Sequence, residues 1–375
     1  MAKTTIEQLA EFGQSVWLDY ISRSLIASGR LHDMVTLGLR GMTSNPTIFD
    51  KAVSSGDEYE KQVQDQHRMG KSTFEIYDDL SVKDIQDAAD VFQEVCENTN
   101  GLDGFVSLEI NPKLAYKTTE TIEEGKRLTK KVNRPNVMFK VPATNDGYEA
   151  IEALLGEGIN VNVTLIFSVG QYRRTAEAYL KGMRKLLQNK GDVSAVRSVA
   201  SVFVSRVDTA VDNLLDELAN KKEFSDTTKK KILSFRGKAA VANAHLIYRA
   251  YADIFSGHEF RQLQQEGVNP QRVLWGSTGT KNPAYSDIKY VSELIAKNTV
   301  NTVPEHTFEA FMDHGRVKQA LTPDVTEAKR IIESLRAFGI DVNTVCNKLL
   351  TDGVIAFEQS FDSLLSTIEK RTGKT

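Results

Sequence analysis

Residues Asn136–Ser168, NVMFKVPATNDGYEAIEALLGEGINVNVTLIFS, hold two short apolar runs on either side of a helical pattern. The first run, Val137–Phe139, meets Lys140 and then continues with Val141. Lysine is among the residues least often buried, unless it is paired or functional. Apolar surroundings favour the neutral amine, and a neutral lysine amine can attack a carbonyl to form a Schiff base. The alternative is a lysine near a strand end that extends its ammonium group into water.

Six further apolar runs, and one weaker candidate at Gly38–Met42, have the length and composition of β-strands. Together with the run that holds Lys140, the predicted strands are Ser15–Leu18, Gly38–Met42, Phe105–Leu108, Val161–Thr164, Ala195–Val204, Arg272–Trp275 and Thr299–Val303. Helical patterns separate them, and this alternation favours a parallel sheet covered by helices. Eight such units predict an α/β fold of the (β/α)8 TIM-barrel type with additional helices. An open doubly wound sheet is the alternative, but Asp19-Tyr20-Ile21 is not the glycine-rich turn expected after its first strand.

The chain of 375 residues can form one large domain or two ordinary ones. We expect a single barrel domain over residues 1–375, with a helical insertion around 207–270 and C-terminal helices over 325–370. The C-terminal stretch carries a sustained apolar stripe that should pack on the body of the protein. Its members are Val342, Val345, Leu349, Val354, Phe357, Phe361, Leu364 and Ile368.

The composition narrows the classes of partner. A net charge of −3 and a pI near 6.1 give no basic excess for nucleic acid or an anionic membrane surface. The two cysteines, Cys96 and Cys346, are too few for a disulfide framework and suit a reducing cytosol. No signal-peptide pattern opens the sequence, and no apolar run is long enough to span a bilayer. These features predict a cytoplasmic protein without a membrane or nucleic-acid partner.

Seven of the predicted strands end at or beside a polar or charged residue. These residues are Asp19, Asn45, Glu109, Lys140, Thr164, Ser201 and Ser277. The carboxyl ends of barrel strands meet at one mouth, where barrel enzymes place their active sites. There Lys140 could form an iminium ion, while Glu109 and Asp19 transfer protons. The amides and hydroxyls suit the hydroxyl groups of a polyol, and this chemistry requires no metal. The six histidines fall mainly on or beside predicted helices, which disfavours a metal site of histidines and carboxylates.

An anion site is predicted at the last loops. Arg206 follows the sixth strand, and the loop Gly276–Lys281, GSTGTK, follows the seventh. Backbone N–H groups and a cation could hold a phosphate there, and barrels often bind phosphate at these loops. The alternative is a plain turn. The lysines of Lys221–Lys231 are mixed with acidic residues and indicate a solvated helical insertion.

Several motifs resemble those of the transaldolase family, in its longer bacterial form, and they occur in family order over nearly the whole chain. They are Thr43–Thr47 (TSNPT), Val106–Glu109 (VSLE), Phe139–Thr144 (FKVPAT), Gly158–Ser168 (GINVNVTLIFS), Ala200–Asp208 (ASVFVSRVD) and Trp275–Pro283 (WGSTGTKNP). The resemblance implies a barrel of the class I aldolase type. Its members transfer a dihydroxyacetone unit from sedoheptulose 7-phosphate or fructose 6-phosphate to an aldose phosphate, without a cofactor, in the non-oxidative pentose phosphate pathway.

The same resemblance implies a role for each matched residue. Lys140 would form the Schiff base, Glu109 would move protons through a water, and Asp19 would act at C–C cleavage. Thr164 would take part in the catalytic group, and the residues that would hold substrate hydroxyls are Thr43, Asn45, Asn162, Ser201 and Phe203. Phosphate would bind to Arg206, Ser277 and Lys281. The shorter relatives carry an arginine soon after the serine of this loop, whereas here the nearest cation is Lys281, four residues on. A lysine offers a point charge and not a bidentate fork.

Two other functions stay open at this stage. A fructose-6-phosphate aldolase of the same Schiff-base type would release free dihydroxyacetone into water. A catalytically inactive barrel could act as a binding or regulatory protein, although intact Lys140, Glu109 and Asp19 disfavour it. The expected ligands are sugar phosphates, and the expected assembly is a monomer or a homodimer.

Overall fold

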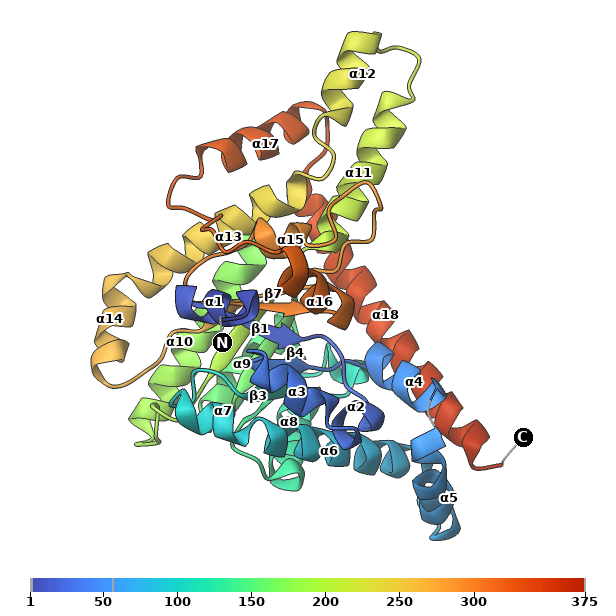
Figure 1. Cartoon of the computed structure of the whole chain (residues 1–375). Coiled ribbons are helices and arrows are strands. Elements are labelled where there is room, and N and C mark those ends of the chain that lie inside the picture. Colours follow the sequence, from blue (N-terminus) through green and yellow to red (C-terminus); the bar gives the residue numbers. More distant parts are fainter. Residues whose placement is uncertain (1–2, 56, 374–375) are drawn as a thin grey trace.

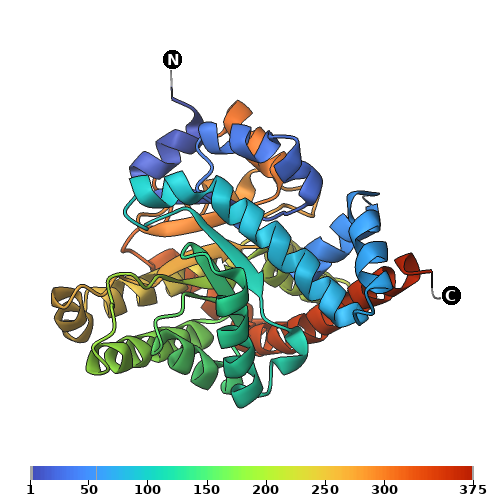
Figure 2. The ribbon, with the colours of Figure 1, turned by 90° about the horizontal axis from the view of Figure 1, so that it is seen from below.

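The computed structural model describes residues 3–55 and 57–373, and at its centre eight parallel strands form a closed barrel (Figures 1 and 2). Each strand pairs with its neighbours in the sequence, and β1 pairs with β8 to close the ring. The strands are β1 Gln14–Leu18, β2 Gly41–Thr43, β3 Phe105–Glu109, β4 Val137–Pro142, β5 Val161–Ile166, β6 Ser198–Phe203, β7 Arg272–Gly276 and β8 Thr299–Val303. This topology confirms the predicted (β/α)8 barrel.

Helices surround the barrel. Those before β5 are α1 Thr5–Phe12, α2 Arg23–Ala27, α3 Arg30–Thr36, α4 Pro46–Ser55, α5 Glu60–Arg68, α6 Thr73–Val91, α7 Gln93–Asn98, α8 Thr118–Val132 and α9 Asn145–Leu155, with 3-10 turns η1 Asp57–Tyr59 and η2 Pro112–Leu114. Those after β5 are α10 Val169–Gln188, α11 Ser205–Ala219, α12 Asp226–Leu233, α13 Ala239–Phe255, α14 His258–Gln265, α15 Lys289–Ser292, α16 Glu305–His314, α17 Thr326–Ala337 and α18 Val342–Arg371. Within the described residues, no helix is long and apolar enough to cross a membrane.

The helical insertion predicted around 207–270 is not one continuous helix. It contains the separate helices α11, α12 and α13, and α11 and α12 project from the body (Figure 1). Ser225 starts α12 because its side chain accepts a hydrogen bond from Thr228 N. Before α13, Gly237 adopts a left-handed φ of +69°, which ends helical geometry there.

Apolar side chains fill the barrel below its mouth. They form one buried cluster drawn from six strands: Trp17, Phe105, Met138, Val199, Leu274 and Val300. Beneath them, Arg272 forms a buried ion pair with Asp103, with 2.9 Å between Nη1 and Oδ1. Asp103 also accepts a hydrogen bond from Ser15 Oγ at 2.7 Å. The barrel is therefore a packed core, and the polar residues at its upper end rest on a closed floor.

The C-terminal helix α18 packs beside α4, α6 and α11, as the apolar stripe predicted (Figures 1 and 2). Thr47 on α4 shares a hydrogen bond of 2.7 Å with Ser360 on α18. Gly353 permits a close approach, because a Cβ there would lie 2.9 Å from Leu165 Cδ2. Leu165 has a left-handed φ of +58° at a register shift in β5. Such a bulge redirects a strand and is common near active sites.

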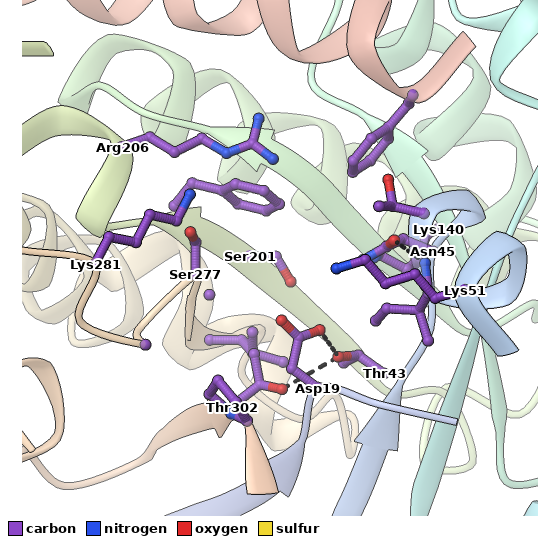
Figure 3. Close-up of a pocket in the computed structure, with 18 residues that line it drawn as sticks. Asp19, Thr43, Asn45, Lys51, Lys140, Ser201, Arg206, Ser277, Lys281 and Thr302 are labelled. Carbon is purple, nitrogen blue, oxygen red and sulfur yellow. Dashed lines mark hydrogen bonds between the residues drawn. The ribbon is translucent and has the colours of Figure 1, made fainter. Parts of the chain in front are cut away.

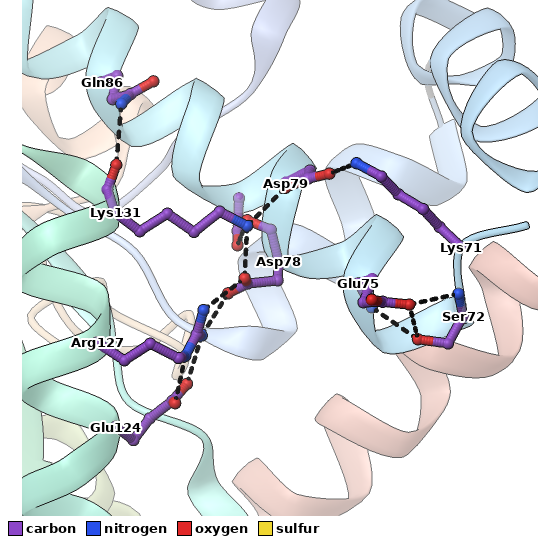
Figure 4. A network of polar contacts seen from close by, with 10 residues as sticks. Lys71, Ser72, Glu75, Asp78, Asp79, Gln86, Glu124, Arg127 and Lys131 are labelled. Atoms are coloured by element: carbon purple, nitrogen blue, oxygen red, sulfur yellow. Dashed lines mark hydrogen bonds and ion pairs between the residues drawn. The ribbon is translucent and has the colours of Figure 1, made fainter. Parts of the chain in front are cut away.

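Charged side chains connect α6 to α8 on the outside of the barrel (Figure 4). Arg127 donates two hydrogen bonds of 2.7 Å to Asp78 and also pairs with Glu124. Lys131 contacts both Asp78 and Asp79, at 2.6 and 2.5 Å. Since a network orders several charges at once, it holds the two helices together better than isolated surface pairs would.

Candidate active site

Lys140 lies on the inner face of β4, near the mouth of the barrel. The strand register places Glu109 of β3 on one side of it and Asn162 of β5 on the other. Lys140 Nζ lies 3.1 Å from Glu109 Oε2 and donates a hydrogen bond of 2.9 Å to Ser44 O. Only about one twentieth of either side chain is exposed, at 5% and 4%. The lysine is thus paired and buried and does not extend into bulk water.

Glu109 has an environment that suits proton transfer. Burial raises the pKa of its carboxyl group, and the opposing charge of Lys140 limits the increase. Oε2 makes no aligned hydrogen bond within the described residues, despite its contact with Lys140. A carboxyl group so close to an amine can accept the proton that the amine must lose before it attacks a carbonyl.

Asp19 follows β1 and is connected to two threonines of the mouth. Its Oδ1 accepts a hydrogen bond of 2.9 Å from Thr43 Oγ1, which lies 3.1 Å from Thr302 Oγ1 (Figure 3). Burial raises the pKa of Asp19, while Lys140, Thr43 and Arg206 act in the opposite direction. Asp19 is therefore a second carboxylate that could exchange protons with a ligand in the mouth.

A line of polar side chains crosses the barrel interior beside the lysine. Ser201 Oγ donates to Asn162 Oδ1 at 2.6 Å, and Asn162 Nδ2 donates to Ser107 Oγ at 2.9 Å. These bonds fix the amide orientation of Asn162. Thr164 lies two residues further along β5 and is fully buried, and its hydroxyl oxygen has no partner within residues 3–55 and 57–373. Thr164 could therefore still donate a hydrogen bond to a ligand or a water.

Three cations approach the mouth from different elements. Arg206 is the second residue of α11, and its guanidinium carbon lies 5.2 Å from the ring centre of Phe203. Lys281 lies in the loop between β7 and α15, and Lys51 lies on α4. Partial burial and the charges of Arg206 and Lys51 lower the pKa of Lys281. Within the part of the chain that the structure describes, none of these three cations forms an ion pair. A bound anion would relieve their mutual repulsion.

These groups meet in a cavity of about 350 Å³ at the mouth (Figure 3). The predicted site residues that line it are Asp19, Thr43, Asn45, Lys140, Ser201, Phe203, Arg206, Ser277 and Lys281. Glu109, Asn162 and Thr164 are not among the lining residues. They lie within the barrel wall, where Glu109 and Asn162 flank Lys140 in the register and Thr164 pairs with Pro142. A ligand in the cavity would reach these three side chains through the space around Lys140.

One predicted strand end is wrong, because β5 continues beyond Thr164 to Ile166. Lys140 and Ser201 were predicted to mark strand ends, but each has two more residues of its strand after it, since β4 ends at Pro142 and β6 at Phe203. The strand ladder continues because residues after the polar groups still pair with the next strand, as Val202 does with Trp275. Asn162 and Thr164 are two residues apart and share the inner face. Asn162 therefore points into the barrel, and this orientation does not depend on the residue at which β5 ends.

The lining residues that were not predicted from the sequence include Lys51, Thr302 and Phe357. Thr302 could have been found, since it lies two residues after the inward-facing Val300. Lys51 and Phe357 carried no local signal, because their positions depend on how α4 and α18 pack over the mouth. Phe357 places its ring centre 6.0 Å from Lys140 Nζ and covers the amine.

The fold and cavity define a class of protein. A closed parallel barrel with a buried lysine–glutamate pair and three cations at its mouth has the features of an enzyme that forms a Schiff base with a phosphorylated carbonyl compound. Residues 16–368 match the family described as "Transaldolase/Fructose-6-phosphate aldolase", and the chain belongs to this family.

Curated relatives extend the comparison over the full length. A transaldolase of Trichodesmium erythraeum is 41% identical over all of this chain and 99% of its own. One from Saccharopolyspora erythraea is 44% identical, and the match covers 98% of both chains. One from Mycobacterium ulcerans is 43% identical over 98% of this chain and 97% of its own. The resemblance seen in the motifs is thus confirmed.

Proposed function

We propose that this protein is a transaldolase that moves a dihydroxyacetone unit between sugar phosphates through a Schiff base on Lys140. The donors are sedoheptulose 7-phosphate and fructose 6-phosphate, and the acceptors are glyceraldehyde 3-phosphate and erythrose 4-phosphate. The observation that carries this proposal is the buried contact of Lys140 Nζ with Glu109 Oε2 at 3.1 Å, at the mouth of the barrel. The full-length matches to relatives named transaldolase support it.

The first step joins the donor to the enzyme. Glu109 takes a proton from Lys140, and the free amine attacks C2 of the ketose to form a C–N bond. The attacking nitrogen passes one proton to the C2 oxygen, Glu109 returns the proton that it took, and this oxygen leaves as water, so that an iminium ion remains. Glu109 is positioned to move these protons, directly or through a water held with Thr164.

The second step breaks the C3–C4 bond. Asp19 takes the proton of the C4 hydroxyl while the bonding electrons move to the iminium nitrogen, giving an enamine and a free aldose phosphate. An acceptor aldehyde then enters, the enamine carbon forms a new bond with it, and Asp19 returns the proton. Hydrolysis of the resulting iminium releases the new ketose phosphate.

Binding groups hold the substrate along this axis. Thr43, Asn45, Asn162 and Ser201 suit the hydroxyl groups near Lys140, and Phe203 forms part of the apolar wall. At the far end, Ser277, Lys281 and Arg206 suit the phosphate, and Lys51 adds a third cation on the facing side of the cavity (Figure 3). An extended sugar phosphate can therefore contact the lysine and the cations together.

A transfer assay distinguishes this activity from that of an aldolase. With fructose 6-phosphate and erythrose 4-phosphate, we expect glyceraldehyde 3-phosphate and sedoheptulose 7-phosphate to form in equal amounts. Without erythrose 4-phosphate, product should stop near one equivalent of enzyme. Continued turnover with release of free dihydroxyacetone would instead identify a fructose-6-phosphate aldolase. A Lys140→Ala variant is the blank for both assays.

The proposal places the protein in the cytoplasm, in the non-oxidative pentose phosphate pathway. Cys96 and Cys346 are free thiols, as expected in a reducing compartment. The proposed reaction requires no metal or organic cofactor, since Lys140 supplies the electron sink. We further propose that residues 1–375 act as one domain, as a monomer or a homodimer.

A further inference from the structure

The loop between β7 and α15 is attached to α11 at two points. At its start, Ser205 N donates to Ser277 O at 3.0 Å, and the hydroxyls of the same two residues lie 3.0 Å apart. Near its end, Tyr285 OH donates a hydrogen bond of 2.5 Å to Asp212 Oδ2. Ser277 has a left-handed φ of +54°, which is costly for a residue other than glycine and persists only where its surroundings enforce it.

The second attachment point is itself held in place. Asp212 is 5% exposed, and its other oxygen accepts a hydrogen bond of 2.9 Å from Gly237 N. Gly237 leaves room for the tyrosine, because a Cβ at this position would lie 2.8 Å from Tyr285 Cζ. One turn earlier on α11, Asp208 accepts hydrogen bonds from Ala240 N and from the hydroxyl of Tyr290. The start of α13 and the tyrosines therefore share two buried carboxylates of α11.

Lys281 lies midway between the two attachment points, four residues from Ser277 and four from Tyr285. Its ammonium group is the only part of this loop that brings a side-chain charge to the mouth cavity among the lining residues. The other cation on this side, Arg206, lies in the first turn of the helix to which both points attach. The two cations are thus carried by elements that are fixed to each other, although neither forms an ion pair within the described residues.

We propose that Tyr285 and Asp212 are positioning residues, which hold the loop so that Lys281 stands beside Arg206 and binds the phosphate of the substrate. This inference rests on the proposed function and extends it to residues that do not touch the substrate. The hydroxyl of Tyr285 acts through the loop, and its loss should affect phosphate binding and leave the chemistry at Lys140 intact. A charge that is free to move binds an anion less well, because binding must then also order it.

The test compares Tyr285→Phe with the unchanged protein. The variant keeps the ring and loses only the hydroxyl. We expect KM for fructose 6-phosphate and the inhibition constant of inorganic phosphate to rise together, by about 3- to 10-fold, on the scale of one typical hydrogen bond. The kcat value should stay within about twofold. Borohydride trapping with unphosphorylated dihydroxyacetone should proceed at an unchanged rate.

Two further variants separate positioning from general damage. Tyr248→Phe removes a hydroxyl that donates to Lys297 O, away from the mouth, and should change neither constant. In a Lys281→Ala background, Tyr285→Phe should add little, because the cation that it positions is already missing. The proposal is overturned if Tyr285→Phe leaves both constants unchanged, slows trapping by dihydroxyacetone, or has its full effect without Lys281.

The same set of variants distinguishes failure of this inference from failure of the proposed function. If Lys281→Ala leaves KM for fructose 6-phosphate unchanged, Lys281 does not bind phosphate and the positioning proposal is overturned. Transfer activity of the same preparation tests the reaction itself, since it depends on Lys140 and not on this loop.

Discussion

Lys140 and Glu109 lie side by side in the buried interior of the barrel. Neither has bulk water to stabilise its charge, and the 3.1 Å contact replaces that solvation. In the mechanism that we propose, Glu109 receives the proton that the amine gives up before it attacks a carbonyl. The chemistry at this position is therefore shared by the pair, and removing either member should disable it.

Glu109→Gln tests this view of the pair. The amide keeps the size of the side chain but cannot take up or deliver a proton at the required step. We expect turnover to fall by about 100-fold or more, the usual scale of general acid–base catalysis. Steady-state transfer assays measure the loss. Glu293→Gln, at an exposed pair with Lys289, is the control and should retain activity. Near-normal turnover of Glu109→Gln would remove the residue from the mechanism.

Thr43→Val tests the role of Asp19 as a base. Burial raises the pKa of Asp19, and the hydrogen bond from Thr43 partly offsets this. Asp19 must be ionised to act, so activity is lost as pH falls through its pKa. Removing the donor raises that pKa further, and the acid limb of kcat/KM should move to higher pH.

Thr302→Val is the matched control for Thr43→Val. It removes a hydroxyl next to Thr43 but leaves the bond from Thr43 to Asp19 in place. The acid limb of kcat/KM for Thr302→Val should lie at the same pH as in the unchanged protein. An unmoved limb in Thr43→Val would show that Asp19 does not set the acid side of the profile.

At the scale of single residues, the sequence predicted nine of the eighteen residues that line the cavity, and it did not predict those that the helices α4 and α18 contribute. Lys140, Glu109 and Asp19 stood out because charges at the ends of apolar strands are unusual. Lys51 and Phe357 lie on helices with ordinary patterns, and only the packing of α4 and α18 brings them to the mouth. Long-range packing of this kind leaves no local signal in the sequence.

Among the elements, α18 has the most direct effect on the site. Its apolar stripe predicted that it packs on the body, but not that Phe357 would cover the amine of Lys140 at 6.0 Å. A covered enamine is shielded from water, and transfer to a second sugar then competes well with protonation and release. We therefore expect this helix to favour transfer over release of free dihydroxyacetone.

Phe357→Leu should weaken that cover without emptying the core. We expect the fraction of turnovers that release free dihydroxyacetone to rise several-fold relative to transfer, because water gains access to the enamine. Parallel assays of dihydroxyacetone and sedoheptulose 7-phosphate measure the ratio. Phe361→Leu is the control, since Phe361 lies one turn further along and packs against Tyr77, away from the cavity. Equal ratios in the two variants would contradict the shielding role of Phe357.

At the scale of the whole molecule, the residues proposed to act in catalysis lie at the mouth of the barrel, and residues that stabilise the fold lie at its floor. The floor contains the buried pair of Arg272 and Asp103, far along the strands from Lys140. The alternation of strands and helices was enough to predict the barrel. It did not predict this pair, because Asp103 lies in a turn and Arg272 begins a strand, and only closure of the barrel brings them together.

Asp103→Asn should destabilise the protein and leave its kinetics unchanged. It leaves the buried charge of Arg272 without its partner, a change that typically costs about 3–5 kcal/mol. Urea or thermal unfolding should reveal the loss, while kcat and KM of the folded protein stay as they are. Asp253→Asn, at an exposed pair with Arg249, should cost less than about 1 kcal/mol. A large change in KM for Asp103→Asn would mean that the floor and the mouth are coupled.

The most direct test of the account is to trap the Schiff base. The protein is incubated with fructose 6-phosphate, reduced with borohydride, digested and analysed by mass spectrometry. We expect a stable dihydroxyacetone-derived addition on the peptide that carries Lys140, and no such addition in the Lys140→Ala variant. An addition on a different lysine, or no addition while transfer activity is present, would contradict it.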